Sequence, residues 1–238
     1  MTASLEARFH EFLATLSCAR NIDATHHDSP REPKRADYIL HDGKLVAEIK
    51  SLNTSQIHKG NSVIDGYLKE TGIEVFGTLP LSSIARSNEH LESIEKTIYI
   101  RMTRNIEKIC KSANEQIKAA SSKTSNLSTG LLIILNEDLK EMDPYLVARR
   151  VWDYTHSKQT SIHYCLLIFE THTVNINGLS RPYPLLMDLT YSARQRRTMA
   201  AIRDLQQKWA MANGYPNGLP EQEPKGEDFY PNGIVFGG

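Results

Sequence analysis

A predicted β-hairpin near position 40 constrains the fold of this chain more than any other segment. Two apolar runs, residues 37–40 and 45–50, flank the pair Asp42-Gly43. An Asp-Gly pair between apolar runs favours a two-residue turn that joins antiparallel strands. With this turn, directly paired positions place Asp37 opposite Glu48 on one face of the sheet. We therefore predict two adjacent antiparallel strands with a pair of carboxylates at one end.

Apolar periodicity predicts the elements around this hairpin. The expected helices cover residues 4–17, about 88–120, a stretch beginning near 144, and 192–212; the expected strands cover 131–135 and 164–169. Residues 21–35 are predicted to be a loop, and residues 51–87 a long irregular excursion with short strands around Ile73–Phe76. This order predicts an α/β (α+β) fold, a central mixed β-sheet flanked by helices.

The length of 238 residues suits one domain. We expect a single domain over residues 1–238, with an elaborated C-terminal part from about residue 140 and an irregular tail from Asn213. A composition with 40% hydrophobic and 24% charged residues is typical of a globular protein. This composition argues against disorder of the whole chain.

Charge and cysteine usage exclude several classes. The 28 basic and 28 acidic residues cancel, so any nucleic-acid contact must depend on local patches or on a metal ion. The three cysteines are far apart in sequence, which argues against a structural zinc site and suits a reducing compartment. The N-terminus lacks a signal-peptide apolar run, and the run Leu131–Leu135 is too short to span a bilayer. We therefore expect a cytoplasmic protein without a membrane partner.

The end of the hairpin combines charged groups in a way that suits a metal ion. Lys50 lies two residues beyond Glu48 and so points to the same face as that carboxylate. Like charges directly opposite each other, as expected for Asp37 and Glu48, are destabilising. A divalent cation removes this penalty, and Mg²⁺ prefers one or two carboxylates with water and phosphate as further ligands.

These residues also resemble a known family. Ala36-Asp37-Tyr38-Ile39-Leu40, ten residues between the acids, and Ala47-Glu48-Ile49-Lys50 resemble the motif of the PD-(D/E)XK nuclease superfamily, which has the restriction-endonuclease-like fold. The resemblance implies an αβββαβ core and Mg²⁺-dependent hydrolysis of DNA phosphodiester bonds, with Mn²⁺ as a substitute. It implies that Asp37, Glu48 and the carbonyl of Ile49 bind the metal and that Asp37, Glu48 and Lys50 are catalytic.

The resemblance covers about residues 5–135. Ala36 stands where the family often has proline, and no first core strand is evident between Asn21 and Arg35. The breadth of the family allows a role in restriction, repair or antiviral defence. For this chain we expect DNA rather than RNA as the partner, and the sequence leaves open a homodimer or a larger defence or repair complex. Three alternatives remain: a nuclease acting on RNA, a non-catalytic nucleic-acid-binding or scaffold domain on this fold, and a surface hairpin that merely ends in charged residues.

Other residues are weaker candidates. Some branches of the family place an acid on the first helix and a glutamine on the helix after the Glu-x-Lys strand, where this chain has Glu6 and Gln116. Possible metal ligands or bases without supporting spacing are His26, His27, His58 and His90. Possible phosphate contacts are the basic stretch 30–35, just before Asp37, and Arg194, Arg196, Arg197 and Arg203, of which Arg196 and Arg203 are spaced seven residues apart and share a helix face. For the basic stretch 30–35, a phosphate contact and a solvated surface are equally favoured; for the others, a solvated surface position is the simpler interpretation.

Overall fold

The computed structural model describes seven segments of the chain. They are residues 3–22, 35–77, 80–122, 128–158, 160–174, 183–190 and 196–215. These segments form one six-stranded sheet and five α-helices. The strands are β1 (Ala19–Asn21), β2 (Tyr38–Leu40), β3 (Leu45–Ser51), β4 (Thr129–Asn136), β5 (Tyr164–Val174) and β6 (Tyr183–Thr190). The helices are α1 (Leu5–Thr15), α2 (Ile57–Thr71), α3 (Asn88–Ser121), α4 (Pro144–Ser157) and α5 (Arg196–Ala212), with a 3-10 turn η2 (Leu81–Ser83).

The sheet is mixed, as predicted. Its order is β1-β2-β3-β4-β5-β6; β3, β4 and β5 are parallel, and the remaining pairs are antiparallel. The hairpin has the predicted register, with Tyr38 opposite Ala47. His41, Asp42 and Gly43 have positive φ values of 51°, 55° and 87°, so the turn contains one more left-handed residue than the two that a type I′ turn requires. The local turn chemistry therefore fixes which residues of β3 face which layer.

One face of the sheet packs against α3 and α4. Alternate residues of the central strands and the inner stripes of both helices share one buried cluster. Its members include Val46, Ile106, Cys110, Ile117, Leu132, Ile134, Val147, Val151 and Leu167. All eight residues of β4 are buried, which is the pattern of a strand covered on both faces.

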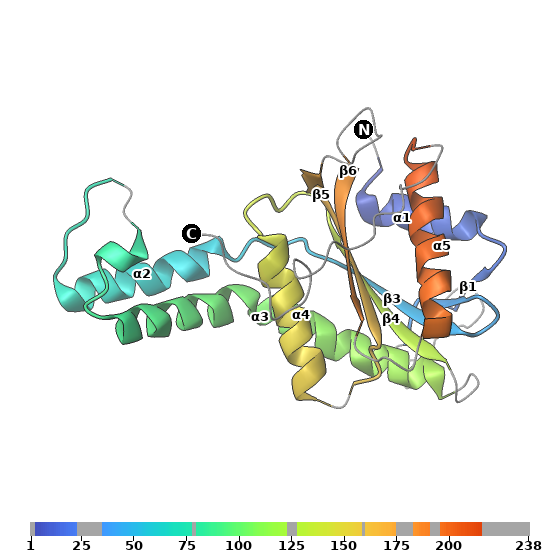
Figure 1. Ribbon diagram of the computed structural model, residues 1–238, viewed down its shortest axis with the longest axis horizontal. Coiled ribbons are helices and arrows are strands. Elements are labelled where there is room, and N and C mark those ends of the chain that lie inside the picture. The colour runs from blue at the N-terminus through green and yellow to red at the C-terminus, as the bar shows by residue number, and fades with distance from the viewer. Residues whose placement is uncertain are drawn as a thin grey trace.

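The opposite face packs against α1 and α5, so the molecule has three layers (Figure 1). The alternate residues Leu45, Ala47 and Ile49 of β3 point to this side. The Trp209 ring of α5 lies 4.8 Å from the ring of Phe9 on α1, measured between centroids. The helices at the two ends of the described chain therefore close the same core.

A two-helix arm, formed by α2 and the first half of α3, projects from these layers (Figure 1). Here the prediction was wrong: residues 51–87 contain α2, and Ile73–Phe76 form no strand. Gly60 and Gly66 lower helix propensity in this segment, but tertiary packing on α3 compensates. A Cβ at Gly60 would lie 2.9 Å from the Met102 sulfur, so the two helices approach closely there.

Two strands were missed by the sequence analysis. β1 begins at Ala19, earlier than the interval in which the family's first strand was sought, and it has only three residues. β6 contains Pro184, which obscured its strand character. Because β6 is an edge strand, it tolerates a residue without a backbone N–H.

The remaining predicted elements are confirmed within the described segments. The predicted helices at 4–17, about 88–120 and near 144 correspond to α1, α3 and α4, and α5 covers the described part of 192–212. The tail beyond Tyr215 lies outside the described residues, as does most of the loop predicted at 21–35. No described helix combines the length and apolarity needed to cross a bilayer.

Candidate active site

Three elements meet at the candidate site: the residue before β2, the second half of β3, and the second half of α3. Asp37 immediately precedes β2. Glu48 and Lys50 follow the alternation of Val46, whose side chain belongs to the cluster under α3 and α4. Gln116 of α3 faces the same region and contacts Lys50. The structure thus brings all three motif residues to one place, on the α3 side of the sheet.

Lys50 connects β3 to the helix. Its Nζ lies 2.5 Å from Glu48 Oε1 and donates a hydrogen bond to Gln116 Oε1 at 2.9 Å. Asp37 does not stand free beside Glu48, because its Oδ2 accepts a 2.7 Å hydrogen bond from the backbone N–H of Ile49. The acids and the lysine are therefore held in a defined arrangement before any ligand binds.

Glu48 is the most unusual group of the site. Its side chain is 1% exposed, and neither carboxylate oxygen has a hydrogen bond of ordinary geometry among the described residues. Oε1 still has the ion pair with Lys50, and the backbone N–H of Asp37 is close enough to lower the pKa of the carboxylate, but Oε2 makes no hydrogen bond of ordinary geometry there. Burial first, and the charge of Asp37 second, raise the pKa of Glu48 from 4.5 to about 7, although Lys50 acts in the opposite direction. A buried carboxylate oxygen without a partner is costly, and such perturbed groups concentrate at functional sites.

Gln116 is part of this network, although the sequence offered it only as a weak candidate. Its side chain is 8% exposed. The amide nitrogen donates to the backbone carbonyl of Arg35 at 3.1 Å, and Oε1 also accepts from Ser112 Oγ at 3.0 Å. Gln116 therefore links the lysine of β3 to the backbone just before Asp37, and it positions both sides of the site.

The donor set suits a hard divalent cation of the Mg²⁺ type. In a strand, the N–H and C=O of one residue point to the same edge. Because the Ile49 N–H points to Asp37, the Ile49 carbonyl also points to that edge. No group of three or more His, Cys, Asp or Glu side chains among the described residues could hold a metal. Two carboxylates and a carbonyl, completed by water and phosphate, still match what Mg²⁺ accepts.

The other sequence candidates lie elsewhere. Glu6 accepts a 2.6 Å hydrogen bond from Ser51 on the α1 side, the face opposite Glu48. His58 and His90 are exposed on helices of the arm. Arg35 is buried, whereas residues 30–34, His26, His27 and Arg194 lie outside the described residues. Arg203 is exposed on α5, and the side chains of Arg196 and Arg197 are not among those described.

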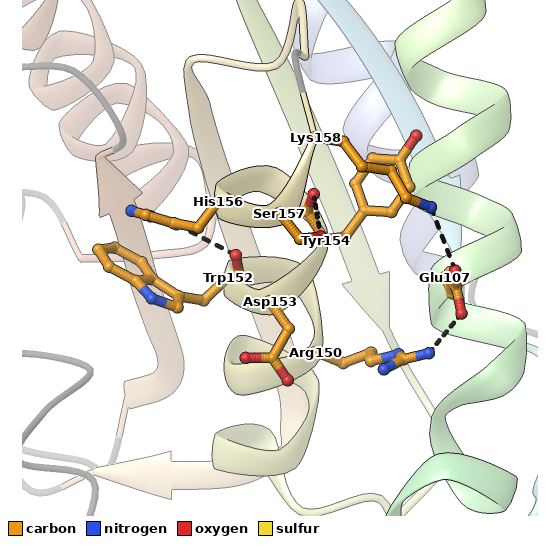
Figure 2. Close-up of a pocket in the computed structure, with 8 residues that line it drawn as sticks. All are labelled: Glu107, Arg150, Trp152, Asp153, Tyr154, His156, Ser157 and Lys158. Carbon is orange, nitrogen blue, oxygen red and sulfur yellow. Dashed lines mark hydrogen bonds and ion pairs between the residues drawn. The ribbon is translucent and has the colours of Figure 1, made fainter.

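A pocket of about 480 Å³ beside α4 was not anticipated from the sequence (Figure 2). Figure 2 shows Glu107 of α3 between Arg150 and Lys158, with which it forms ion pairs. On the other side of α4, the rings of Trp152 and His156 stack with centroids 3.5 Å apart. The charges of this pocket compensate one another, and no motif residue lines it. It is therefore not the candidate active site.

Comparisons with known proteins add no information about this site. No protein-family model, no curated protein and no solved structure matches the chain.

Proposed function

We propose that this protein is a Mg²⁺-dependent nuclease with a restriction-endonuclease-like core. The principal support is the Glu48 carboxylate, which is 1% exposed, lies beside a second acid and a lysine, and has an Oε2 that makes no hydrogen bond of ordinary geometry among the described residues. The element order is consistent with the proposed core, since α1, β1, β2 and β3 precede α3 and β4, with α2 as an insertion. The resemblance of the motif to PD-(D/E)XK nucleases supplies the reaction class.

Asp37, Glu48 and the Ile49 carbonyl would hold the cation. When bound, Mg²⁺ supplies Lewis-acid activation of a phosphoryl oxygen and lowers the pKa of a water ligand. Asp37 is oriented for this task by the Ile49 N–H. Glu48 presents Oε2, which makes no hydrogen bond of ordinary geometry among the described residues.

Lys50 would act on the phosphate. Its ammonium is held at 2.9 Å by Gln116 Oε1, so it keeps its position when Glu48 binds a cation. A fixed ammonium beside the scissile phosphate stabilises the negative charge that develops in the transition state. Gln116 contributes by orienting Lys50 and does not itself need to touch the substrate.

One observation favours a second candidate, a non-catalytic nucleic-acid-binding or scaffold domain. The 2.5 Å ion pair between Lys50 and Glu48 could exist only to balance a buried charge. The two functions differ in metal dependence. A scaffold would bind partners equally well with or without a divalent cation, whereas the nuclease needs one to act.

The test is a cleavage assay on a panel of single-stranded, duplex and branched DNA and RNA. The purified protein is incubated with each substrate in Mg²⁺, in Mn²⁺ and in EDTA. We expect cleavage of at least one DNA substrate in either metal and none in EDTA. Cleavage of RNA alone would keep the chemistry and change the substrate. No cleavage of any substrate in either metal would refute the proposal in favour of the scaffold.

A further inference from the structure

A second cavity adjoins the candidate active site. It has a volume of about 590 Å³ and lies between the segment that follows β3, the start of α2, and the middle of α3. Ser51, the residue after Lys50, lines this cavity. Strand β3 therefore leads directly from the motif residues into the cavity wall. The other walls come from the base of the two-helix arm. The α2 part of this arm lies in the segment predicted to be irregular, whereas α3 lies in a predicted helix.

The cavity is positively charged. Lys59 of α2 and Arg104 and Lys108 of α3 line it, and none of its lining residues is acidic. Within the described residues, these three cations form no ion pair, unlike Arg150 and Lys158 in the pocket beside α4. The chain as a whole has zero net charge. A cavity with three uncompensated cations is therefore a local feature that favours an anionic ligand.

The cations of α3 lie along the helix from the candidate active site. Arg104, Lys108, Ser112 and Gln116 are spaced four residues apart, so each lies about one turn further along α3 and about 40° further around its axis than the one before. At about 1.5 Å of rise per residue, Lys108 lies about 12 Å along the axis from Gln116. Successive nucleotides of one duplex strand rise by about 3.4 Å. A strand cleaved beside Lys50 would thus reach the cavity within a few nucleotides.

A buried amide supplies a second, independent sign of a ligand. Gln56 lines the cavity and is 5% exposed. Its nitrogen donates weakly to the Thr54 carbonyl at 3.4 Å, but its Oε1 has no hydrogen-bond partner among the described residues. A buried acceptor without a donor is unfavourable. A DNA strand can provide that donor through a base amino group, because the phosphodiesters and sugars within the strand carry no O–H.

We infer that this cavity binds the sugar-phosphate backbone of the substrate strand beside the cleaved bond, with Lys59, Arg104 and Lys108 on its phosphates. The inference rests on the proposed nuclease function for the identity of the strand. It assigns a role to the two-helix arm, because α2 supplies one cation and the residue just before α2 supplies the Gln56 amide. Substrate binding would then depend on this insertion as well as on the motif residues.

The test measures binding, not cleavage. A labelled DNA oligonucleotide that wild type binds is titrated in EDTA, at about 50 to 200 mM salt, with wild type and with the triple variant Lys59→Ala, Arg104→Ala and Lys108→Ala. The control is the triple variant Lys69→Ala, Lys96→Ala and Lys118→Ala. It removes the same charge from α2 and α3 at exposed positions that do not line the cavity. Competition with inorganic phosphate and with a mononucleotide tests whether a strand is required.

We expect the cavity variant to bind at least about tenfold more weakly. The slope of log Kd against log salt concentration should fall by about 1 to 3, or about 1 for each phosphate contact that is lost. The control should stay near wild type, and both variants should keep the wild-type melting temperature. Equal weakening in the two variants would overturn the inference, as would tight competition by phosphate alone. Either result would leave the cleavage assay unaffected. Conversely, strand binding that depends on the cavity, without any cleavage in Mg²⁺, would support the inference and refute the nuclease function.

Discussion

Replacing Glu48 by glutamine should stabilise the metal-free protein while removing its activity. The Glu48 side chain is 1% exposed, and Oε2 makes no hydrogen bond of ordinary geometry among the described residues. Glutamine has nearly the same shape and no charge, and its oxygen can still accept a hydrogen bond from Lys50. The variant therefore removes the buried charge without creating a cavity. Such a gain in stability at the expense of function is typical of active-site residues.

The magnitude follows from the pKa of Glu48, which rises from 4.5 to about 7 on folding. Between these values the folded protein binds the proton more tightly than the unfolded chain, so the stability of wild type falls as pH rises through this window. At about 1.4 kcal/mol per pKa unit, the loss above pH 7 is about 3 kcal/mol. Glu48→Gln does not titrate and avoids this loss. Its gain over wild type should be about 3 kcal/mol at pH 8 and under about 1 kcal/mol at pH 5.

The assay is thermal unfolding in EDTA at both pH values. For a chain of this length, the gain at pH 8 corresponds to an increase in melting temperature of about 6 to 12 °C. Glu107→Gln is the control. Burial tends to raise the pKa of Glu107, but the ion pairs with Arg150 and Lys158 outweigh burial and lower it, so this variant should not be more stable. A Glu48→Gln variant less stable than wild type at pH 8 would refute the reasoning and make the ion pair with Lys50 structural.

Four further predictions concern the site, the sheet and α2. Lys50→Ala should reduce cleavage about a hundredfold or more, and it should also lower the melting temperature in EDTA, because the buried Glu48 loses its ion pair; full cleavage would contradict a catalytic role. Asp37→Asn should weaken Mg²⁺ or Mn²⁺ binding in calorimetry, and unchanged affinity would exclude Asp37 as a ligand. Gly130→Ala would place a Cβ 1.9 Å from a backbone carbonyl oxygen and should destabilise the fold by more than about 2 kcal/mol. Gly66→Ala, with no atom within 4 Å of the new Cβ, should instead stabilise α2 by about 0.5 to 1 kcal/mol; equal melting temperatures of these two variants would contradict the packing described for β4.

Local features were predictable from the sequence because their causes are local. The turn at Asp42 and Gly43 fixes the register of β2 and β3, and strand alternation then places Glu48 and Lys50 on one face. The continuous apolar run of β4 likewise identified a strand buried on both sides. These arguments need only neighbouring residues and the period of the element.

Features that depend on distant contacts were not predictable. Gln116 contacts Lys50 across 66 positions of sequence, and the spacing of α3 alone could not show which side faces β3. The helix α2 was missed because its glycines and polar residues weaken the local signal, while its stability comes from packing on α3. The cations Lys59, Arg104 and Lys108 were missed because the cavity that they line forms only when α2 packs on α3. Only the four-residue spacing of Arg104 and Lys108 could have suggested that these two cations lie on one face of α3.

The central claim is that Asp37, Glu48 and Lys50 form a metal-dependent phosphodiesterase site. The most direct test compares initial cleavage rates of one DNA substrate in Mg²⁺ for wild type, Glu48→Gln and Glu107→Gln, purified in the same way. We predict cleavage by wild type and by Glu107→Gln at similar rates, and a rate for Glu48→Gln lower by about a hundredfold or more. Equal rates for all three proteins would contradict the account, because the cleavage would then come from another site or from a contaminant.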